Sequence, residues 1–125
     1  GYSIGLDMTR RDLQAEMKRL GRPWEVSKAV EGSAPTSQLH LREETGFITS
    51  GIIKLLVNGE IKQESNLNKM IWSVSEQISI LSEYYELAAG DIIMTGTPAG
   101  VGPVKKGDVM LGSIEGLGDL TVTVD

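Results

Sequence analysis

A short segment near the start of the chain, GLDMTRRDLQ at residues 5–14, combines three groups that could carry chemistry. The carboxylate of Asp7 is a hard oxygen ligand suited to a divalent cation, and the guanidinium of Arg11 can bind a carboxylate through a two-pronged hydrogen bond. Gln14 adds an amide on the first turn of a predicted helix. From spacing alone, it is equally open that Asp7 is a turn residue and that Arg11 pairs with an acid of its own helix.

A lysine, Lys28, ends the segment PWEVSK at residues 23–28, after a tryptophan that we expect to anchor the loop. A lysine there could stabilise an enolate or an oxyanion as it forms. On the sequence alone, however, a solvated surface lysine is the favoured interpretation.

The glycine-rich segment TGTPAGVGP, residues 95–103, follows an apolar stretch. Its glycines would let main-chain N–H groups and the hydroxyl of Thr97 approach a ligand closely. The segment is neither a Walker loop nor a dinucleotide-binding loop, because it lacks the Gly-Lys-Ser/Thr ending and the G-x-G-x-x-G spacing. A tight connection between strands would explain the glycines equally well, but it would not explain two threonines flanking one of them.

The remaining polar residues have simpler explanations. His40 is the only histidine, so no Ser-His-Asp order and no pair of metal-binding histidines can be built from it, and we interpret it as an incidental loop residue. Asp91 and Asp108 each follow a glycine just before an apolar stretch, which predicts turn residues. The chain has no cysteine, which excludes thiolate chemistry and disulfides and fits a reducing compartment such as the cytoplasm.

Two helices are predicted to position these groups. Thr9 is a candidate N-cap for a helix over residues 10–20, which Gly21 and Pro23 would end. A second apolar stripe predicts a helix that follows a cap at Ser65 or Asn66 and runs to about Ser82.

Strands are predicted in the rest of the chain. The Asn58-Gly59 pair between residues 53–57 and 60–63 indicates a β-hairpin with a type I′ turn. From Gly90 onward, short apolar stretches alternate with glycine-rich turns, so we expect further strands, at residues 92–95, 109–111 and 120–124. With few helices to link parallel strands, this predicts an α+β fold: a mixed, mostly antiparallel β-roll with flanking helices.

Size and charge limit the possible partners. The 125 residues fit a single domain, and their formal net charge of −5 does not favour binding to a phosphate backbone. No apolar run approaches the roughly 20 residues that span a bilayer. Neither nucleic acid nor a membrane is therefore an expected partner.

Four motifs together resemble the fumarylacetoacetate hydrolase family: GYSIGLDMTRRDLQ at 1–14, PWEVSK at 23–28, VNGE at 57–60 and GDIIMTGTPAGVG at 90–102. Their order and spacing agree with that family along essentially the whole chain. The similarity is closest to the branch that contains acylpyruvases, fumarylpyruvate hydrolases and oxaloacetate decarboxylases. The resemblance implies metal-dependent hydrolysis of a C–C bond in acylpyruvate-type substrates, with oxaloacetate decarboxylation as a further activity.

The resemblance also implies roles for individual residues. Asp7 matches a ligand to Mg2+ or Mn2+, and Lys28 matches the catalytic lysine that polarises the substrate near the metal. Arg11, Gln14, Lys28 and Thr97 match positions that bind the 2-oxo acid substrate. A homodimer is expected on the same ground.

One departure from the family is as informative as the match. The family holds its metal with two further glutamates in an upstream Glu-x-Glu segment, and this branch adds a His-Glu pair on an N-terminal lid. Glu43 and Glu44 lie in the wrong place to replace them. The chain is thus expected to be a catalytic domain, 1–125, that lacks its N-terminal portion and is inactive alone. The other hypothesis is a non-catalytic β-roll that serves ligand binding or oligomerisation and has lost the metal site.

Overall fold

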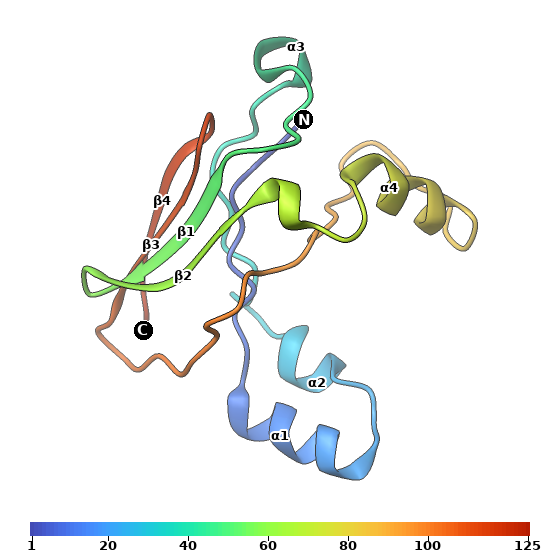
Figure 1. Cartoon of the computed structure of the whole chain (residues 1–125). Helices are drawn as coiled ribbons and strands as arrows, with labels where there is room; N and C mark the ends of the chain where they lie inside the picture. Colours follow the sequence, from blue (N-terminus) through green and yellow to red (C-terminus); the bar gives the residue numbers. More distant parts are fainter.

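The centre of the molecule is an antiparallel sheet of four strands: β1 (Ile52–Val57), β2 (Glu60–Asn66), β3 (Val109–Ile114) and β4 (Gly118–Thr123). Their order across the sheet is β2-β1-β3-β4, as Figure 1 shows. The structure is a computed structural model, and it describes all of residues 1–125. The predicted α+β class is confirmed, and all the strand pairs are antiparallel.

The helices lie around this sheet. In Figure 1 the first two form a lobe at one end, the third lies at the opposite end, and the last projects to the side. None of them has the length and hydrophobicity needed to cross a lipid bilayer. The helices are α1 (Arg11–Leu20), α2 (Glu25–Lys28), α3 (Arg42–Thr45), the 3-10 helix η1 (Leu67–Lys69) and α4 (Val74–Ser82).

The hairpin of β1 and β2 forms where the sequence predicts it. Asn58 and Gly59 both have positive φ, 51° and 81°, as a type I′ turn requires. Val57 faces Glu60 across this turn, and the register of the pair then shifts between Leu56 and Leu55. On its other side β1 pairs with β3, so the hairpin is continuous with the C-terminal part of the chain.

An extended segment at the N-terminus lies against the sheet. Tyr2 and Gly5 form isolated antiparallel bridges with His40 and Thr36. Ile4 and Leu6, by contrast, are buried. The side chains alternate between buried and exposed along this extended segment, so Asp7 faces outward just before α1.

The ends of α1 follow the prediction only in part. Gly21 adopts the left-handed conformation, with φ 63°, and its N–H donates to the Lys18 carbonyl, so it ends the helix as expected. At the other end the N-cap is Arg10, not Thr9, and no side chain caps the helix. The Thr9 hydroxyl instead donates to the Asp7 carbonyl, while the Arg10 N–H donates to the Ser27 carbonyl of α2.

The prediction of one long second helix is wrong, because two separate caps start two shorter helices. The Asn66 side chain accepts from the Asn68 N–H and begins η1, which ends as Met70 turns to an extended conformation. Ser73 and Glu76 then form a reciprocal capping box that begins α4. The spacing of the apolar residues does not reveal the interruption between the two helices.

The strand predicted at residues 92–95 does not form. Gly90 and Gly96 on its two sides have φ of 99° and 116°, and no backbone hydrogen bond joins this segment to a strand. The segment is held by its side chains, since Met94 lies against Gly5 of the N-terminal segment. It therefore connects α4 to the glycine-rich loop without joining the sheet.

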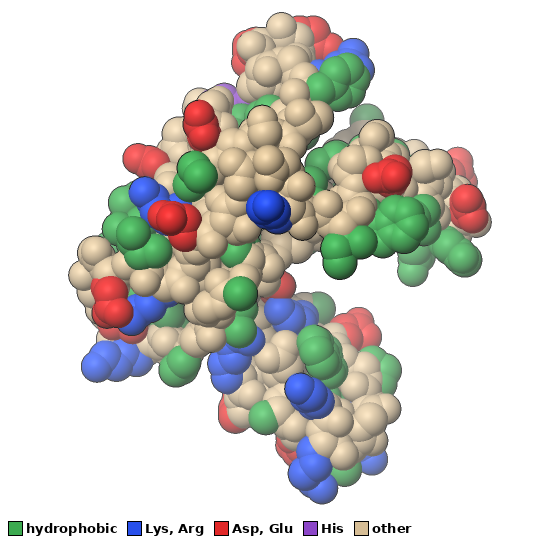
Figure 2. All heavy atoms as spheres, viewed as in Figure 1, with side chains coloured by type: hydrophobic (Ala, Val, Ile, Leu, Met, Phe, Trp, Pro, Cys, Tyr) green, Lys and Arg blue, Asp and Glu red, His purple; other side chains and the backbone are tan.

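The buried core is small for a chain of this length. The accessible surface is 8853 Å2, about a third more than the roughly 6,500 Å2 expected for a compact monomer of 13.5 kDa. Hydrophobic side chains are visible on the surface around α4 in Figure 2. The strongly exposed ones there include Ile71, Trp72, Tyr84, Tyr85 and Ile92.

A buried carboxylate, Asp108, fixes the turn into β3. Its Oδ1 accepts from the Asn58 side chain at 2.9 Å, and its Oδ2 accepts from the Lys105 N–H at 3.0 Å. Asn58 in turn accepts from the Val109 N–H. The hydrogen bond from Asn58, followed by that from Lys105, lowers the pKa of Asp108. The prediction that Asp108 is a structural turn residue is confirmed.

We expect the network around Asp108 to make stability depend on pH. Because its pKa is lower in the folded state, Asp108 stabilises the fold above the ordinary aspartate pKa of about 3.9, and this contribution is lost as the pH falls through the folded value. In D108N the midpoint of thermal unfolding at pH 7 should fall by about 5 °C and should decline less on acidification. Thermal unfolding between pH 3 and 7 tests this, with exposed Asp119→Asn as the control. The prediction would be contradicted if the midpoints of wild type and D108N fell by the same amount on acidification.

Candidate functional site

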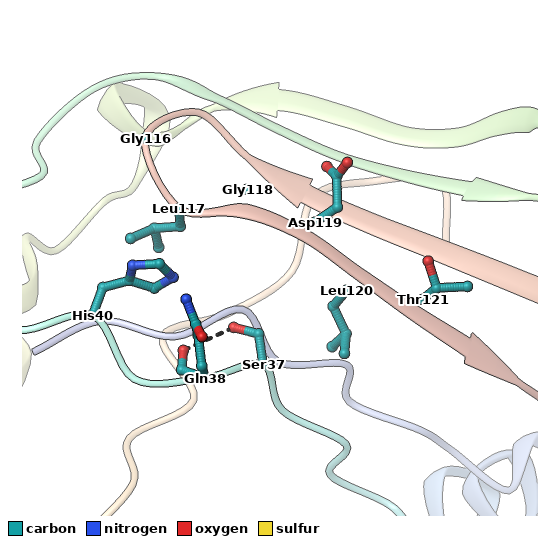
Figure 3. Close-up of a pocket in the computed structure, with 9 residues that line it drawn as sticks. All are labelled: Ser37, Gln38, His40, Gly116, Leu117, Gly118, Asp119, Leu120 and Thr121. Atoms are coloured by element: carbon teal, nitrogen blue, oxygen red, sulfur yellow. Dashed lines mark hydrogen bonds between the residues drawn. The ribbon is translucent and has the colours of Figure 1, made fainter.

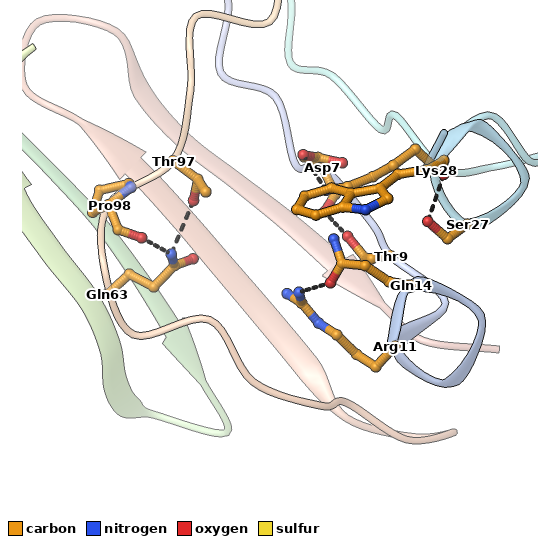
Figure 4. A network of polar contacts seen from close by, with 10 residues as sticks. Asp7, Thr9, Arg11, Gln14, Ser27, Lys28, Gln63, Thr97 and Pro98 are labelled. Carbon is orange, nitrogen blue, oxygen red and sulfur yellow. Dashed lines mark hydrogen bonds and ion pairs between the residues drawn. The ribbon is translucent and has the colours of Figure 1, made fainter. Parts of the chain in front are cut away.

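A single cavity brings the sequence-predicted site residues together. It has a volume of about 1110 Å3 and lies between the start of α1, α2, the sheet and the glycine-rich loop. Figure 4 shows two clusters of polar contacts, one on the loop and β2 and the other on the helices. The lining of the cavity includes Asp7, Arg11, Gln14, Lys28 and Thr97.

Asp7 and Lys28 form an ion pair in this cavity. The Nζ of Lys28 lies 2.6 Å from the Oδ2 of Asp7, and the two side chains are 31% and 40% exposed. Asp7 comes from the extended N-terminal segment, whereas Lys28 is the last residue of α2. The fully buried Ser27 fixes this turn, because its hydroxyl donates to the Trp24 carbonyl. The interpretation of Lys28 as a solvated surface lysine holds in part, since its side chain is 31% exposed but Lys28 lines the cavity and pairs with a carboxylate.

Arg11 and Gln14 lie one turn apart on α1 and contact each other. The Nη1 of Arg11 donates to the Gln14 Oε1 at 3.0 Å. Arg11 forms no ion pair with an acid of its own helix, so the alternative considered for it does not hold. The contact leaves most of the guanidinium donors and the amide N–H groups of Gln14 available to a ligand.

Thr97 approaches the cavity from the opposite side. Its hydroxyl oxygen accepts from the Nε2 of Gln63 on β2 at 2.9 Å, and the same nitrogen donates to the Pro98 carbonyl at 2.5 Å. Sequence reasoning identified Thr97 but treated Gln63 only as a strand residue. The only sequence signal for a role of Gln63 is that it is a polar residue in a predicted strand. Nothing in the sequence shows that its side chain is buried.

The cavity carries more positive than negative charge. Five of its lining residues are cationic and two are anionic, although the net charge of the whole chain is −5; one of the five, Lys62, pairs its ammonium group with Glu60 outside the lining. Such an excess of cations in a cavity attracts anionic ligands. The cationic side chains are Arg10, Arg11, Lys28, Lys54 and Lys62, and the carboxylates are Asp7 and Asp12.

Asp7 fits one position in a metal site but not a whole site. Its carboxylate is a suitable hard ligand, with Oδ2 already paired to an ammonium group. No group of three or more histidine, aspartate or glutamate side chains is arranged to hold a metal ion. Glu43 and Glu44 lie on α3, at the end of the molecule away from α1. These 125 residues therefore offer a single carboxylate where a divalent cation needs several oxygen ligands.

A second, shallower cavity of about 600 Å3 lies beside the turn between β3 and β4 (Figure 3). His40 lines it, with Asp119 among the other residues. No hydrogen bond or ion pair joins the imidazole to an acid, and the contact drawn there runs from the Ser37 hydroxyl to the Gln38 carbonyl. His40 is more than a loop residue, because its backbone forms the bridge with Tyr2, while its side chain has no acidic partner.

The whole chain, residues 1–125, matches the family profile described as fumarylacetoacetate (FAA) hydrolase C-terminal. Over 124 residues the chain is 47% identical to a fumarylpyruvate hydrolase from a Ralstonia species. It is also 42% identical over 125 residues to a mitochondrial oxaloacetate tautomerase of Homo sapiens. A crystal structure of fumarylpyruvate hydrolase from Pseudomonas aeruginosa, in complex with Mn2+ and pyruvate, superimposes with a TM-score of 0.96 at 51% identity.

These relatives are considerably longer than this chain. The alignments cover 99–100% of the chain but only 64% of the Ralstonia protein, 57% of the human protein and 53% of the Pseudomonas structure. The chain thus spans between about half and two thirds of each relative. The chain therefore resembles one part of each of these proteins.

We expect the glycine-rich loop to depend on Gly100. A Cβ atom there would lie 2.0 Å from the Lys62 carbonyl oxygen of β2, and φ is 100°. Gly100→Ala should therefore push the loop off β2 and destabilise the protein by roughly 1–3 kcal/mol. Gly102→Ala is the matched control, since it has open space and no positive φ, and its effect should stay within about 0.5 kcal/mol. Denaturant unfolding measures both, and equal effects would disprove the importance of the close contact.

Proposed function

Because the chain belongs to the fumarylacetoacetate hydrolase family, we propose that it is the part of an enzyme that hydrolyses a C–C bond in acylpyruvate-type substrates. Fumarylpyruvate and acetylpyruvate are representative substrates, and oxaloacetate decarboxylation is proposed as a second reaction of the same site. The observation that carries the proposal is one cavity with more cationic than anionic lining residues, whose lining includes Asp7, Arg11, Lys28 and Thr97.

Each side chain has a proposed task set by its chemistry. The guanidinium of Arg11 and the hydroxyl of Thr97 bind the oxygen atoms of the 2-oxo acid, and the amide of Gln14 assists them. Lys28 places a positive charge where the enolate of pyruvate develops as the C–C bond breaks. In hydrolysis the distal acyl carbon gains the hydroxyl of water, and the departing carbon of pyruvate gains the proton.

A divalent cation, Mg2+ or Mn2+, is the proposed cofactor, with Asp7 as one of its ligands. When bound, the cation supplies Lewis-acid stabilisation of negative charge on substrate oxygens. The support is the chemistry of the Asp7 carboxylate and the complex of the Pseudomonas relative with Mn2+ and pyruvate. Two further glutamate ligands are expected from the resemblance alone, outside these 125 residues.

The second hypothesis is a non-catalytic β-roll for ligand binding or oligomerisation. A domain with a purely structural role would have no physical reason to keep an ion-paired lysine, an arginine and a threonine around one cavity, although it could keep any of them singly. The joint placement of these groups therefore favours the enzyme.

A homodimer is proposed as the working assembly, on the resemblance and on the extent of exposed apolar surface. Burial of that surface against another protein surface would be favourable by about 25 cal/mol per Å2. Light scattering of the purified protein, coupled to size-exclusion chromatography, should give twice the chain mass across a tenfold range of concentration. A monomer mass throughout that range would refute this proposal.

Pyruvate release tests the proposed reaction directly. The chain, produced with whatever coding sequence precedes Gly1, should release pyruvate from acetylpyruvate, fumarylpyruvate or oxaloacetate in a coupled assay with Mg2+ or Mn2+. Because Lys28 is proposed to stabilise the developing enolate and Asp7 to hold the cation, K28M and D7A should each lower kcat by about 100-fold or more. Chelation of the metal should abolish the reaction.

Matched controls separate these effects from loss of folding. Lys18→Met and Asp119→Ala change the same residue types outside the cavity and should keep wild-type rates. The 125-residue chain alone, with one candidate carboxylate ligand, is expected to be inactive. No pyruvate from any of the three substrates with the extended protein would overturn the enzyme and favour the non-catalytic domain.

A further inference from the structure

Gln63 is a buried polar side chain that links the sheet to the glycine-rich loop. It lies on β2, is 8% exposed, and lines the cavity opposite the Asp7–Lys28 pair. Its amide contacts two successive residues of the loop, Thr97 and Pro98 (Figure 4). It donates both of these hydrogen bonds.

The orientation of this amide is determined by its partners. A carbonyl oxygen can only accept, so the nitrogen of Gln63 must face the Pro98 carbonyl, 2.5 Å away. The second hydrogen of the same nitrogen then points to the hydroxyl oxygen of Thr97 at 2.9 Å. Both hydrogens of the NH2 group are used within the loop.

This arrangement decides what the Thr97 hydroxyl can do. Its oxygen already accepts from Gln63, and no protein acceptor receives its own hydrogen. The Thr97 side chain lines the cavity. We propose that Gln63 is a positioning residue that makes the Thr97 hydroxyl a hydrogen-bond donor into the cavity, directed at an oxygen of an anionic ligand.

A second contact keeps the loop in register with Gln63. Gly100, three residues after Thr97, lies so close to the Lys62 carbonyl that no side chain fits between them. The loop is therefore held on β2 at two adjacent strand positions, by a backbone contact at Lys62 and by the amide at Gln63. These two contacts place the loop backbone on the strand, and the hydrogen bond from Gln63 orients the Thr97 hydroxyl.

The inference deepens the proposed function, on which it rests, by naming the ligand atom that Thr97 recognises. The hydrogen of the hydroxyl favours a carboxylate or keto oxygen, and one lone pair is all that its oxygen retains for a ligand that presents N–H or O–H groups at that point. Without the amide, the Thr97 hydroxyl could turn to the Pro98 carbonyl or to water, and the cavity would lose an oriented donor.

A double-mutant cycle on Gln63 and Thr97 tests the inference through ligand binding. Calorimetry of the upstream-extended protein with pyruvate, in the presence of Mn2+, gives the dissociation constant for the wild type, Q63L, T97V and the double variant. Each single variant should weaken binding about tenfold, as expected for a lost hydrogen bond to a charged group. The double variant should be no weaker than T97V, because Gln63 acts through Thr97.

Two further measurements separate positioning from folding. Q63E places an acceptor beside the Thr97 hydroxyl and should weaken pyruvate binding at least as much as Q63L. Gln77, which also donates to a backbone carbonyl but lies on α4 outside the cavity, supplies the control variant Q77L with unchanged binding. Thermal unfolding of each variant reports any general loss of structure.

The outcomes distinguish this inference from the proposed function. Coupled losses of pyruvate binding support it even if the wild type shows no turnover, which would refute only the proposed reaction. Multiplicative losses, or wild-type binding in Q63L, would overturn it while leaving the reaction intact. If the wild type binds no pyruvate, both fail.

Discussion

The packing of the N-terminal segment on the sheet is the constraint on which the cavity depends. Ile4 and Leu6 are buried against β3 at Gly112, where a Cβ atom would lie 3.3 Å from the Leu6 side chain and 3.4 Å from that of Ile4. Because an extended chain alternates its faces, the same contact turns Asp7 toward the cavity and fixes where α1 begins. Gly112 therefore influences the position of the Asp7 carboxylate without contacting it.

The two sides of the cavity are held by different kinds of force. Apolar packing at Ile4 and Leu6 fixes the side that carries Asp7, while hydrogen bonds from Gln63 and the close approach of Gly100 fix the side that carries Thr97. Apolar packing is tolerant in direction, whereas a buried amide specifies both distance and donor. The geometry is therefore specified more exactly on the loop side, where the proposed role of Thr97 depends on the direction of its hydroxyl.

Local signals in the sequence predicted the local parts of this structure. Asn58-Gly59 and Gly21 need positive φ, so their turns could be located without any knowledge of tertiary contacts. The glutamine at position 63 could not be assigned a role, because its burial depends on a loop more than 30 residues away. For the same reason the apolar residues at 92–95 were mistaken for a strand: their partner is Gly5, a tertiary contact with no periodic signature.

The Asp7–Lys28 pair contributes little to the stability of the fold. Its side chains are 40% and 31% exposed, and ion pairs so open to solvent stabilise a fold by at most about 1 kcal/mol. The 2.6 Å contact joins residues of two different segments and adds little to the stability of the fold. Each side chain can therefore exchange its partner for another. Water or ligand oxygens can replace either partner at little cost to the fold. The pair lies in a cavity lined by more cationic than anionic residues, which agrees with the proposed binding of anionic substrates.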